Sequence, residues 1–206
     1  MFITFEGPEG SGKTTVANII VRRLQDLGHK VIHTREPGGT PIAEAIRDVI
    51  LNKQNVNLDP RAEALLYAAS RRQHLVEKVW PALKEGKIVV CDRYLDSSLA
   101  YQGGARDLGV ENILNVNMFA TEGTFPNLTL LFDITPEDGL KRIAQNANRE
   151  VNRLDLESIN FHHKVRNTFL KLAETYKDRY IVINAALPLE EVVENTWNEI
   201  LKRLGE

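Results

Sequence analysis

The sequence predicts an α/β fold in which a parallel sheet is covered by helices on both faces. Short apolar runs alternate with segments whose apolar residues recur at helical spacing, as they do in βαβ units. The runs are rich in β-branched and aromatic residues, which is typical of strands buried on both faces. The 206 residues suffice for one such domain, and neither an internal repeat nor a convincing linker divides them. We therefore expect a single domain over residues 1–206.

The apolar runs give five candidate strands, at residues 2–5, 31–33, 88–91, 128–132 and 180–183. Between and after them the spacing predicts helices at 12–27, 41–51, 60–83, 110–122, 136–145, 155–176 and 189–204. Gly28 supplies a stop for the first helix, and Pro81 should perturb the end of the third. Two polar stretches, 102–109 and 145–152, are expected to be loops above the carboxyl edge of the sheet, where open α/β sheets bind ligands.

The composition excludes several classes of partner. Hydrophobic residues make up 43% and charged residues 26%, which is ordinary for a soluble globular protein. The formal net charge of −2 gives no polyanion-binding surface, so nucleic acid is not expected as a partner. The longest apolar stretches are too short to cross a bilayer, and no signal-peptide pattern precedes Phe2, so we expect no membrane partner and a cytoplasmic location. Cys91 lies inside an apolar run and is expected to be a buried structural thiol.

A phosphate-binding motif joins the first strand to the first helix. The segment GPEGSGKT, residues 7–14, fits G-x-x-x-x-G-K-[ST] at every fixed position. Glycines at both ends let the backbone wrap closely and point N–H groups at one anion, and the helix N-terminus faces the same place. A Gly-rich turn can also serve packing alone, but the full motif in this context predicts binding of a nucleoside triphosphate. The residues expected to bind it are Gly7, Pro8, Glu9, Gly10, Ser11, Gly12, Lys13, Thr14 and Thr15.

Two arginines indicate which phosphate chemistry follows. A switch GTPase would need N-K-x-D after a late strand, and the nearest string, NKQN at 52–55, lacks the Asp and follows a helix. Arg35 and Arg93 stand at the ends of the second and third strands, so they should face the same crevice as the phosphate loop. Arginine binds phosphate bidentately and keeps its charge. A single arginine is usually a solvated surface residue, but two at adjacent strand ends favour a second phosphate site, and hence a nucleotide acceptor.

The nature of the acceptor decides what the site must supply. A nucleoside hydroxyl must lose a proton and needs a carboxylate base, whereas a phosphate acceptor needs only charge neutralisation and alignment. The arginines favour the phosphate acceptor. A deoxyribonucleoside kinase is the alternative, and a P-loop NTPase switch or binding module is a more distant one.

Four segments resemble signature segments of one family. FEGPEGSGKTT, TREPGGT, LLYAASRRQH and CDRYLDSSLAYQGGARDLG are similar to those of bacterial-type thymidylate kinases, which are P-loop nucleoside monophosphate kinases, and the match covers essentially the whole chain. The resemblance implies transfer of the γ-phosphoryl of ATP to dTMP with Mg²⁺, giving dTDP and ADP for dTTP synthesis. It also implies a five-stranded parallel sheet in the order 2-3-1-4-5, a mobile lid at about 142–157 and a homodimer.

The same resemblance implies a role for individual residues. Lys13 and the loop amides would hold the ATP phosphates, Thr14 would help bind Mg²⁺ with Asp92 near the metal, and Glu9 would hydrogen-bond the 3′-hydroxyl of the deoxyribose. Glu9 could instead be a solvated loop carboxylate, and Asp92 a structural one. The substrate-binding set that it implies is Arg35, Glu36, Pro37, Arg47, Tyr67, Arg71, Asp92, Arg93, Ser97, Ser98, Tyr101 and Gln102.

Within that set the phosphate, base and sugar have separate partners. Arg35 and Arg93 would hold the dTMP phosphate, with support from Arg47. Tyr67 would stack on thymine, and Arg71, four residues later on the same helix face, would donate to O4. The remaining base edge and the sugar would be contacted by Ser98, Gln102 and Tyr101. For the two tyrosines the alternative is packing in the core.

The chain departs from the family pattern at several positions. Residues 8–11 of the phosphate loop carry no arginine, so the lid should supply the catalytic cation, with Arg149 and Arg153 as candidates. The resemblance thus implies a catalytic set of Lys13, Arg93, Arg149, Arg153 and Glu9. Asn152 precedes Arg153 where family lids often have Asp, which leaves open how Arg153 is held. Tyr67 stands where Phe is more usual. A further departure is Asn184, which stands before Ala185 where the family has Asp. The role of Asp133 is left open: it is either a second carboxylate beside Mg²⁺ or the cap of the next helix.

Overall fold

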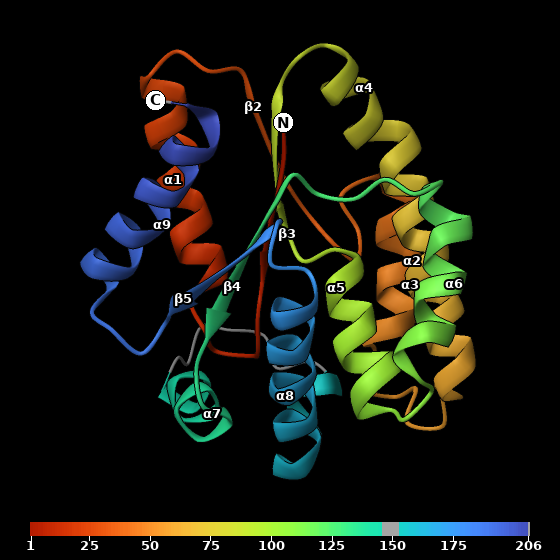
Figure 1. Ribbon diagram of the computed structural model, residues 1–206. Coiled ribbons are helices and arrows are strands. Elements are labelled where there is room, and N and C mark those ends of the chain that lie inside the picture. Colours follow the sequence, from red (N-terminus) through yellow and green to blue (C-terminus); the bar gives the residue numbers. More distant parts are fainter. Residues whose placement is uncertain (146–152, 206) are drawn as a thin grey trace.

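The computed structural model describes residues 1–145 and 153–205 (Figure 1). Its centre is a five-stranded parallel sheet in the order β2-β3-β1-β4-β5, as the resemblance implied. The strands are β1 (Phe2–Glu6), β2 (Val31–Arg35), β3 (Ile88–Asp92), β4 (Leu128–Asp133) and β5 (Tyr180–Asn184). Each strand extends one or two residues past the expected run and ends on a polar residue. The carboxyl edge of the sheet is therefore a row of polar side chains.

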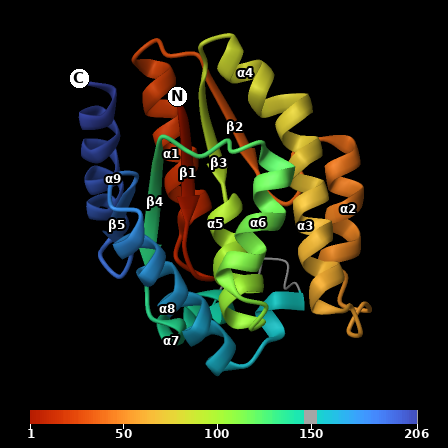
Figure 2. The ribbon, with the colours of Figure 1, turned by 45° about the vertical axis from the view of Figure 1, so that its right-hand side comes forward.

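Helices cover both faces of this sheet (Figures 1 and 2). On one face lie α1 (Lys13–Asp26) and α9 (Leu189–Leu204). The other face packs against the remaining long helices, and α7 (Pro136–Gln145) lies near the carboxyl edge. The helices of the second face are α2 (Pro41–Leu51), α3 (Pro60–His74), α4 (Trp80–Lys84), α5 (Leu95–Ser98), α6 (Val110–Thr121) and α8 (Ile159–Thr175).

Alternate residues of each strand enter two separate cores. In β3, Val89 and Cys91 join the core under α3, α6 and α8, whereas Ile88 and Val90 join the core under α1 and α9. Both sides of the strand are buried, which explains why the strands read as unbroken apolar runs. Burial also raises the pKa of the Cys91 thiol well above its ordinary value, so the expected structural role of this cysteine is confirmed.

The third expected helix, residues 60–83, is continuous but irregular in the structure. A π-helical segment, η1 (Leu75–Val79), separates α3 from α4, and Pro81 lies at the start of α4. Pro81 lacks the N–H that a regular helix would donate, and the wider turns before it accommodate this loss. The expected perturbation is therefore confirmed, one turn before the proline.

The expectation of a loop at 102–109 was wrong over its first part. A π-helical segment, η2 (Leu99–Ala105), continues α5 and buries Gln102. The adjacent Gly103 and Gly104 suggested a loop, but here they allow close packing: a Cβ at Gly103 would lie 3.0 Å from Cα of Val110, and one at Gly104 would lie 2.1 Å from the hydroxyl of Thr168.

The second expected loop, 145–152, falls outside the described residues from 146 onward. The chain resumes in a 3₁₀ turn, η3 (Arg153–Leu156), and α8 begins at Ile159 instead of at residue 155. Ser158 caps α8 by accepting a hydrogen bond from the N–H of Phe161, which fixes this later start. None of the helices in the described part of the chain has the length and apolar character that crossing a membrane requires.

Candidate active site

The phosphate loop turns sharply between β1 and α1. Gly10 and Gly12 adopt φ of +72° and +81°, a region that favours glycine. Gly12 caps α1 without a side-chain hydrogen bond, so the first N–H groups of the helix remain available to an anion. The backbone therefore has the shape that the motif predicts.

One wall of this loop rests on α7 through backbone alone. A Cβ added at Gly10 would lie 2.1 Å from the carbonyl oxygen of Gly139, and a Cβ at Gly139 would lie 2.3 Å from the carbonyl oxygen of Glu9. Both distances are too short for any side chain. The two glycines thus allow the loop and the helix to touch.

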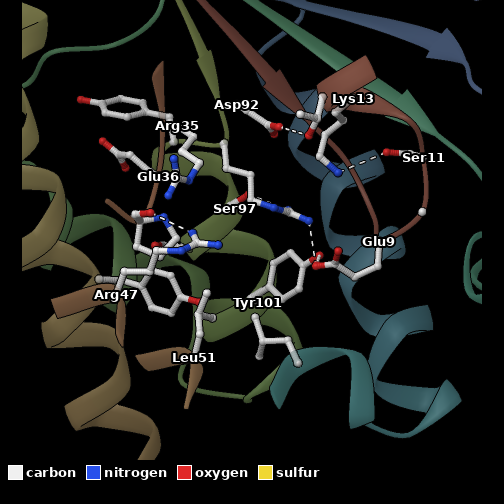
Figure 3. Close-up of a pocket in the computed structure, with 18 of the residues that line it drawn as sticks. Glu9, Ser11, Lys13, Arg35, Glu36, Arg47, Leu51, Asp92, Ser97 and Tyr101 are labelled. Atoms are coloured by element: carbon white, nitrogen blue, oxygen red, sulfur yellow. Dashed lines mark hydrogen bonds and ion pairs between the residues drawn. The ribbon is translucent and has the colours of Figure 1, made fainter. Parts of the chain in front are cut away.

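Lys13 folds back over the loop. Its Nζ donates to the carbonyl oxygens of Gly7 and Pro8, at 3.1 and 2.9 Å, and to the hydroxyl of Ser11 at 3.2 Å (Figure 3). Burial, together with the nearby charge of Arg93, lowers the pKa of Lys13 to about 8. A polyphosphate in the loop would offer this amine stronger acceptors and would favour its charged form.

The two residues expected near a metal are in direct contact. Thr14, in the first turn of α1, donates its hydroxyl hydrogen to the carboxylate of Asp92 at the end of β3. Strand pairing places Asp92 beside Phe5 of β1 and Arg35 of β2, directly next to the phosphate loop. Hydroxyl and carboxylate oxygens suit Mg²⁺, which takes one or two protein ligands and shares the rest with water and substrate phosphates. These two residues therefore fit a Mg²⁺ ion held largely by a nucleotide.

Arg93 follows β3 in a strained conformation. Its φ of +67° lies in the left-handed region, which is costly outside glycine and common at functional sites. Its Nη2 pairs with Oε1 of Glu9 at 2.8 Å, and Nη1 donates to the carbonyl of Gly7 and the hydroxyl of Ser97, at 3.1 and 3.0 Å. Burial alone would lower the pKa of Arg93, but the nearby Glu9, Tyr101, Asp92 and Glu6 together outweigh burial and raise the pKa. Arg93 is thus a partly buried, permanent cation.

Tyr101 completes this group. Its hydroxyl donates to Oε1 of Glu9 at 3.0 Å, and its ring centroid lies 5.0 Å from the guanidinium carbon of Arg93. The side chain of Glu9 therefore joins the phosphate loop to both residues (Figure 3).

A buried carboxyl group that sequence reasoning missed lies behind Arg93. Glu6, the last residue of β1, accepts from the backbone N–H of Tyr94 at 2.8 Å and from the hydroxyl of Ser97 at 2.6 Å. Burial and the charge of Asp96 raise the pKa of Glu6 to about 8. The sequence did contain a sign that Glu6 belongs to the site, because it is the one charged residue between an apolar run and the phosphate loop.

Arg71, on α3, is held on several sides. Its exposed fraction is 1%, and it donates to Glu36, Ser98, Asn117 and the carbonyl of Tyr94. These bonds use four of its five N–H groups. One N–H on Nη2 has no partner among the described residues, and Arg71 lines the pocket described below. Glu36, expected in the substrate-binding set, also accepts from His74 at 2.9 Å and so anchors Arg71.

The other expected phosphate-binding arginines lie nearer the rim. The side chain of Arg35 is 53% exposed and pairs with Glu44 at 3.0 Å, whereas that of Arg93 is 17% exposed. Arg47 donates to the carbonyl of Pro37 at 2.9 Å. Arg93 is therefore the inner cation and Arg35 the outer one.

A single pocket brings most of the expected residues together. Its volume is about 1140 Å³, larger than typical pockets for one small molecule. It is lined by residues 9–15 of the phosphate loop and by every member of the expected substrate-binding set, Tyr67 and Gln102 included. The remaining lining residues include Arg142, Ile143 and Leu154, which fall in the expected lid. Sequence reasoning missed the others, which are Asp48, Leu51, Asn52, Lys53, Gln54 and Tyr94.

Arg153, one of the two expected lid arginines, does not line this pocket. Arg149 lies outside the described residues. Arg153 is buried, pairs with Glu63 of α3 and donates through Nε to the carbonyl of Ile50 at 3.2 Å. Family lids often have an Asp before this arginine, where this chain has Asn152. In this chain the carboxylate that pairs with Arg153 is that of Glu63. Asp133 makes a two-point ion pair with Arg166, at 2.7 and 2.8 Å.

Comparison with known proteins agrees with this geometry. The thymidylate kinase family model matches residues 5–196. The chain is 55% identical to a thymidylate kinase of Geobacillus sp. (strain WCH70), covering 98% of this chain and 97% of the relative. It is 59% identical to a thymidylate kinase of Clostridium novyi (strain NT), covering 94% of each. The crystal structure of thymidylate kinase from Ehrlichia chaffeensis superposes with a TM-score of 0.78 at 30% identity, covering 98% of both chains. With its phosphate loop, sheet order and buried arginines, this chain belongs to the thymidylate kinase family.

Proposed function

We propose that one continuous pocket of this chain carries both substrates of the family reaction, the ATP-dependent phosphorylation of dTMP to dTDP. The observation that carries the proposal is the contact between Glu9 of the phosphate loop and Arg93, because it joins a triphosphate site to a second, partly buried cation. Nucleotides bound on the two sides would meet at this point. Alignment of the two phosphates then accounts for much of the rate.

The donor side is the phosphate loop. Lys13 and the loop amides bind the β- and γ-phosphates, with Lys13 exchanging its carbonyl partners for phosphate oxygens. Thr14 and Asp92 would hold Mg²⁺, which bridges the phosphates and neutralises their charge.

The acceptor side is built from β2, β3, α3 and η2. Arg93 gives the dTMP phosphate an inner partner and Arg35 an outer one. Tyr67 stacks on the base, and the remaining Nη2 hydrogen of Arg71 donates to O4. A phosphate acceptor is already ionised, so this side needs no general base.

The remaining cation is assigned to the segment after α7. The phosphate loop lacks an arginine at residues 8–11, so Arg149 and Arg153 are proposed to neutralise charge on the transferred phosphoryl group. Arg153 would have to leave Glu63 to do so.

A homodimer is proposed on the face formed by α2, α3 and α6, which lie side by side (Figure 2). These helices and η1 expose large apolar side chains, which are Ile42, Val49, Leu65, Val76, Met118 and Phe119. Phe119 is 90% exposed, which is costly unless a partner covers it. Phe119→Asp should shift the chain from dimer to monomer in light scattering, whereas wild-type protein that is monomeric at micromolar concentration would contradict the proposal.

A cytoplasmic location stays a prediction.

The function is tested by offering ATP and each common nucleoside monophosphate to the purified protein and measuring ADP release. We expect dTMP to give the highest kcat/KM, with dUMP a poorer substrate because it lacks only the buried methyl contact. Phosphorylation of thymidine but not of dTMP would instead support the deoxyribonucleoside kinase alternative.

A further inference from the structure

Glu63 is a fully buried carboxylate that sequence reasoning did not single out. It lies on α3, one turn before Tyr67, and its exposed fraction is 0%. It accepts from Nε2 of Gln102 at 2.8 Å and pairs with Arg153 and, at 3.4 Å, with Arg106. Burial alone would raise its pKa, but hydrogen bonds from Arg153 and Gln102, together with the charges of the two arginines, outweigh burial and lower the pKa. Glu63 is therefore ionised and can only accept hydrogen bonds.

This fixes the orientation of the Gln102 amide. A primary amide has a donor end and an acceptor end, and only the donor end can face a carboxylate. The NH₂ group of Gln102 therefore points at Glu63, and its carbonyl oxygen Oε1 is the polar atom left for the pocket that Gln102 lines. Among the described residues nothing donates to Oε1.

The two fixed groups complement one edge of thymine. Thymine offers a donor at N3–H beside an acceptor at O4, whereas cytosine offers an acceptor at N3 beside an amino donor. A carbonyl from Gln102 and an N–H from Arg71 match thymine and mismatch cytosine at both positions.

We infer that Glu63 is a specificity-determining positioning residue, which makes the enzyme select bases that carry N3–H by locking Gln102 as an acceptor. The inference rests on the proposed placement of the dTMP base between Tyr67 and Gln102. It assigns to Glu63 an effect on the choice of nucleotide that is separate from its pairing with Arg153.

The experiment is the substitution Glu63→Gln, which is close in size and can both donate and accept. Gln102 can then turn its amide and offer NH₂ to N3 of cytosine. We expect the ratio of kcat/KM for dTMP over dCMP to fall about tenfold. The ratio of the dissociation constant for dCMP over that for dTMP, measured without ATP, should fall by a similar factor. Both ratios come from one preparation, so a loss of folded protein cancels.

The matched control is Glu157→Gln. Glu157 pairs with Arg106 at 2.6 Å, so its loss removes one charge from the same cluster without touching Gln102. The dTMP-to-dCMP ratio should stay within about twofold of the wild-type ratio, as for a partly exposed pair. In a Gln102→Leu background, Glu63→Gln should change the ratio no further.

Each alternative outcome is distinct. An unchanged ratio in Glu63→Gln would overturn the inference, and so would an equal fall in the Gln102→Leu background, because Glu63 would then act through another group. A wild-type protein that does not prefer dTMP over dCMP would overturn the proposed placement of the substrate itself.

Discussion

The hydroxyl of Thr14 donates a hydrogen bond to the carboxylate of Asp92, joining the first turn of α1 to the end of β3. The strand β1 leads into the phosphate loop and α1, and it pairs with β3. The contact is therefore a second link between these two neighbouring segments, at the centre of the site. Oxygen atoms from both residues thus lie next to each other beside the phosphate loop.

Asp92→Asn should weaken the use of Mg²⁺ more than the binding of ATP alone. The amide keeps the shape of the side chain but loses the charge that orients Thr14 and attracts the metal. We expect the Mg²⁺ concentration for half-maximal rate to rise between tenfold and a hundredfold, as in other metal sites whose supporting carboxylate is lost. Titration of activity with Mg²⁺ at fixed ATP checks this, and an unchanged midpoint would show that Asp92 is only structural.

Arg93→Ala should impair dTMP binding and turnover together. Arg93 is the inner cation and is proposed to meet the acceptor phosphate in both the ground and the transition state, so kcat/KM should fall at least about a hundredfold. Arg35→Ala is the comparison, because Arg35 is half exposed and paired with Glu44, and its loss should cost less. A normal KM for dTMP in Arg93→Ala would place the phosphate elsewhere.

Removal of Arg149 or Arg153 should lower kcat about a hundredfold while the KM for dTMP changes little. The expected reason is that these cations act on the transferred phosphoryl group and not on bound dTMP. Steady-state kinetics of the two alanine variants separate the effects. Wild-type turnover in both variants would mean that the phosphate loop needs no added arginine.

Tyr101→Ala should narrow the difference between dUMP and UMP. The ring of Tyr101 packs beside Arg93 and is expected against the sugar, where it would crowd a 2′-hydroxyl. Tyr101→Phe keeps the ring and loses only the bond to Glu9, so it should retain the preference for deoxyribose. The order of kcat/KM in the wild type is expected to be dTMP, dUMP, then UMP, with dCMP and purines near background. If the gap stays the same in Tyr101→Ala, another group reads the sugar.

The raised pKa of Glu6 predicts a specific pH dependence of stability. Its pKa rises from an ordinary 4.5 to about 8 on folding, so between these values the folded state holds a proton that the unfolded chain has released. The stabilisation is complete below about pH 4.5 and is lost as the pH rises through about 8. Relative to wild type, Glu6→Gln should gain on the order of 1 kcal/mol or more in free energy of unfolding between pH 5 and pH 8. Urea unfolding at both pH values measures this, and a constant difference would contradict it.

Sequence patterns predicted well those helices and strands whose own apolar residues show which of their faces are buried. β3 reads as an apolar run because both its faces are covered, and α2 and α9 have the expected bounds. The patterns failed at Gly103 and Gly104, because adjacent glycines in a sequence usually indicate a loop. Here the two glycines lie in a helical segment, and their lack of side chains lets α6 and α8 pack closely against it.

The site was predictable as a set of residues but not as a set of contacts. The motifs found most of the residues that line the pocket, since each motif places chemical groups at a strand end or on a helix face. Glu6 and Glu63 were missed because a carboxylate in a sequence is usually solvated. Their burial depends on partners far along the chain, Ser97 for Glu6 and Arg153 for Glu63, which only the fold brings near.

The contact between Gly10 and Gly139 gives the site a rigid reference point. Because backbone meets backbone there, no rotamer change can widen or narrow the gap, and an alanine at either position would push the two segments apart. Gly139 also lies inside a helix, where alanine would ordinarily be favoured by roughly 1 kcal/mol. Stabilising substitutions chosen by helix propensity should therefore avoid this position, since an alanine that stabilised α7 would displace the phosphate loop.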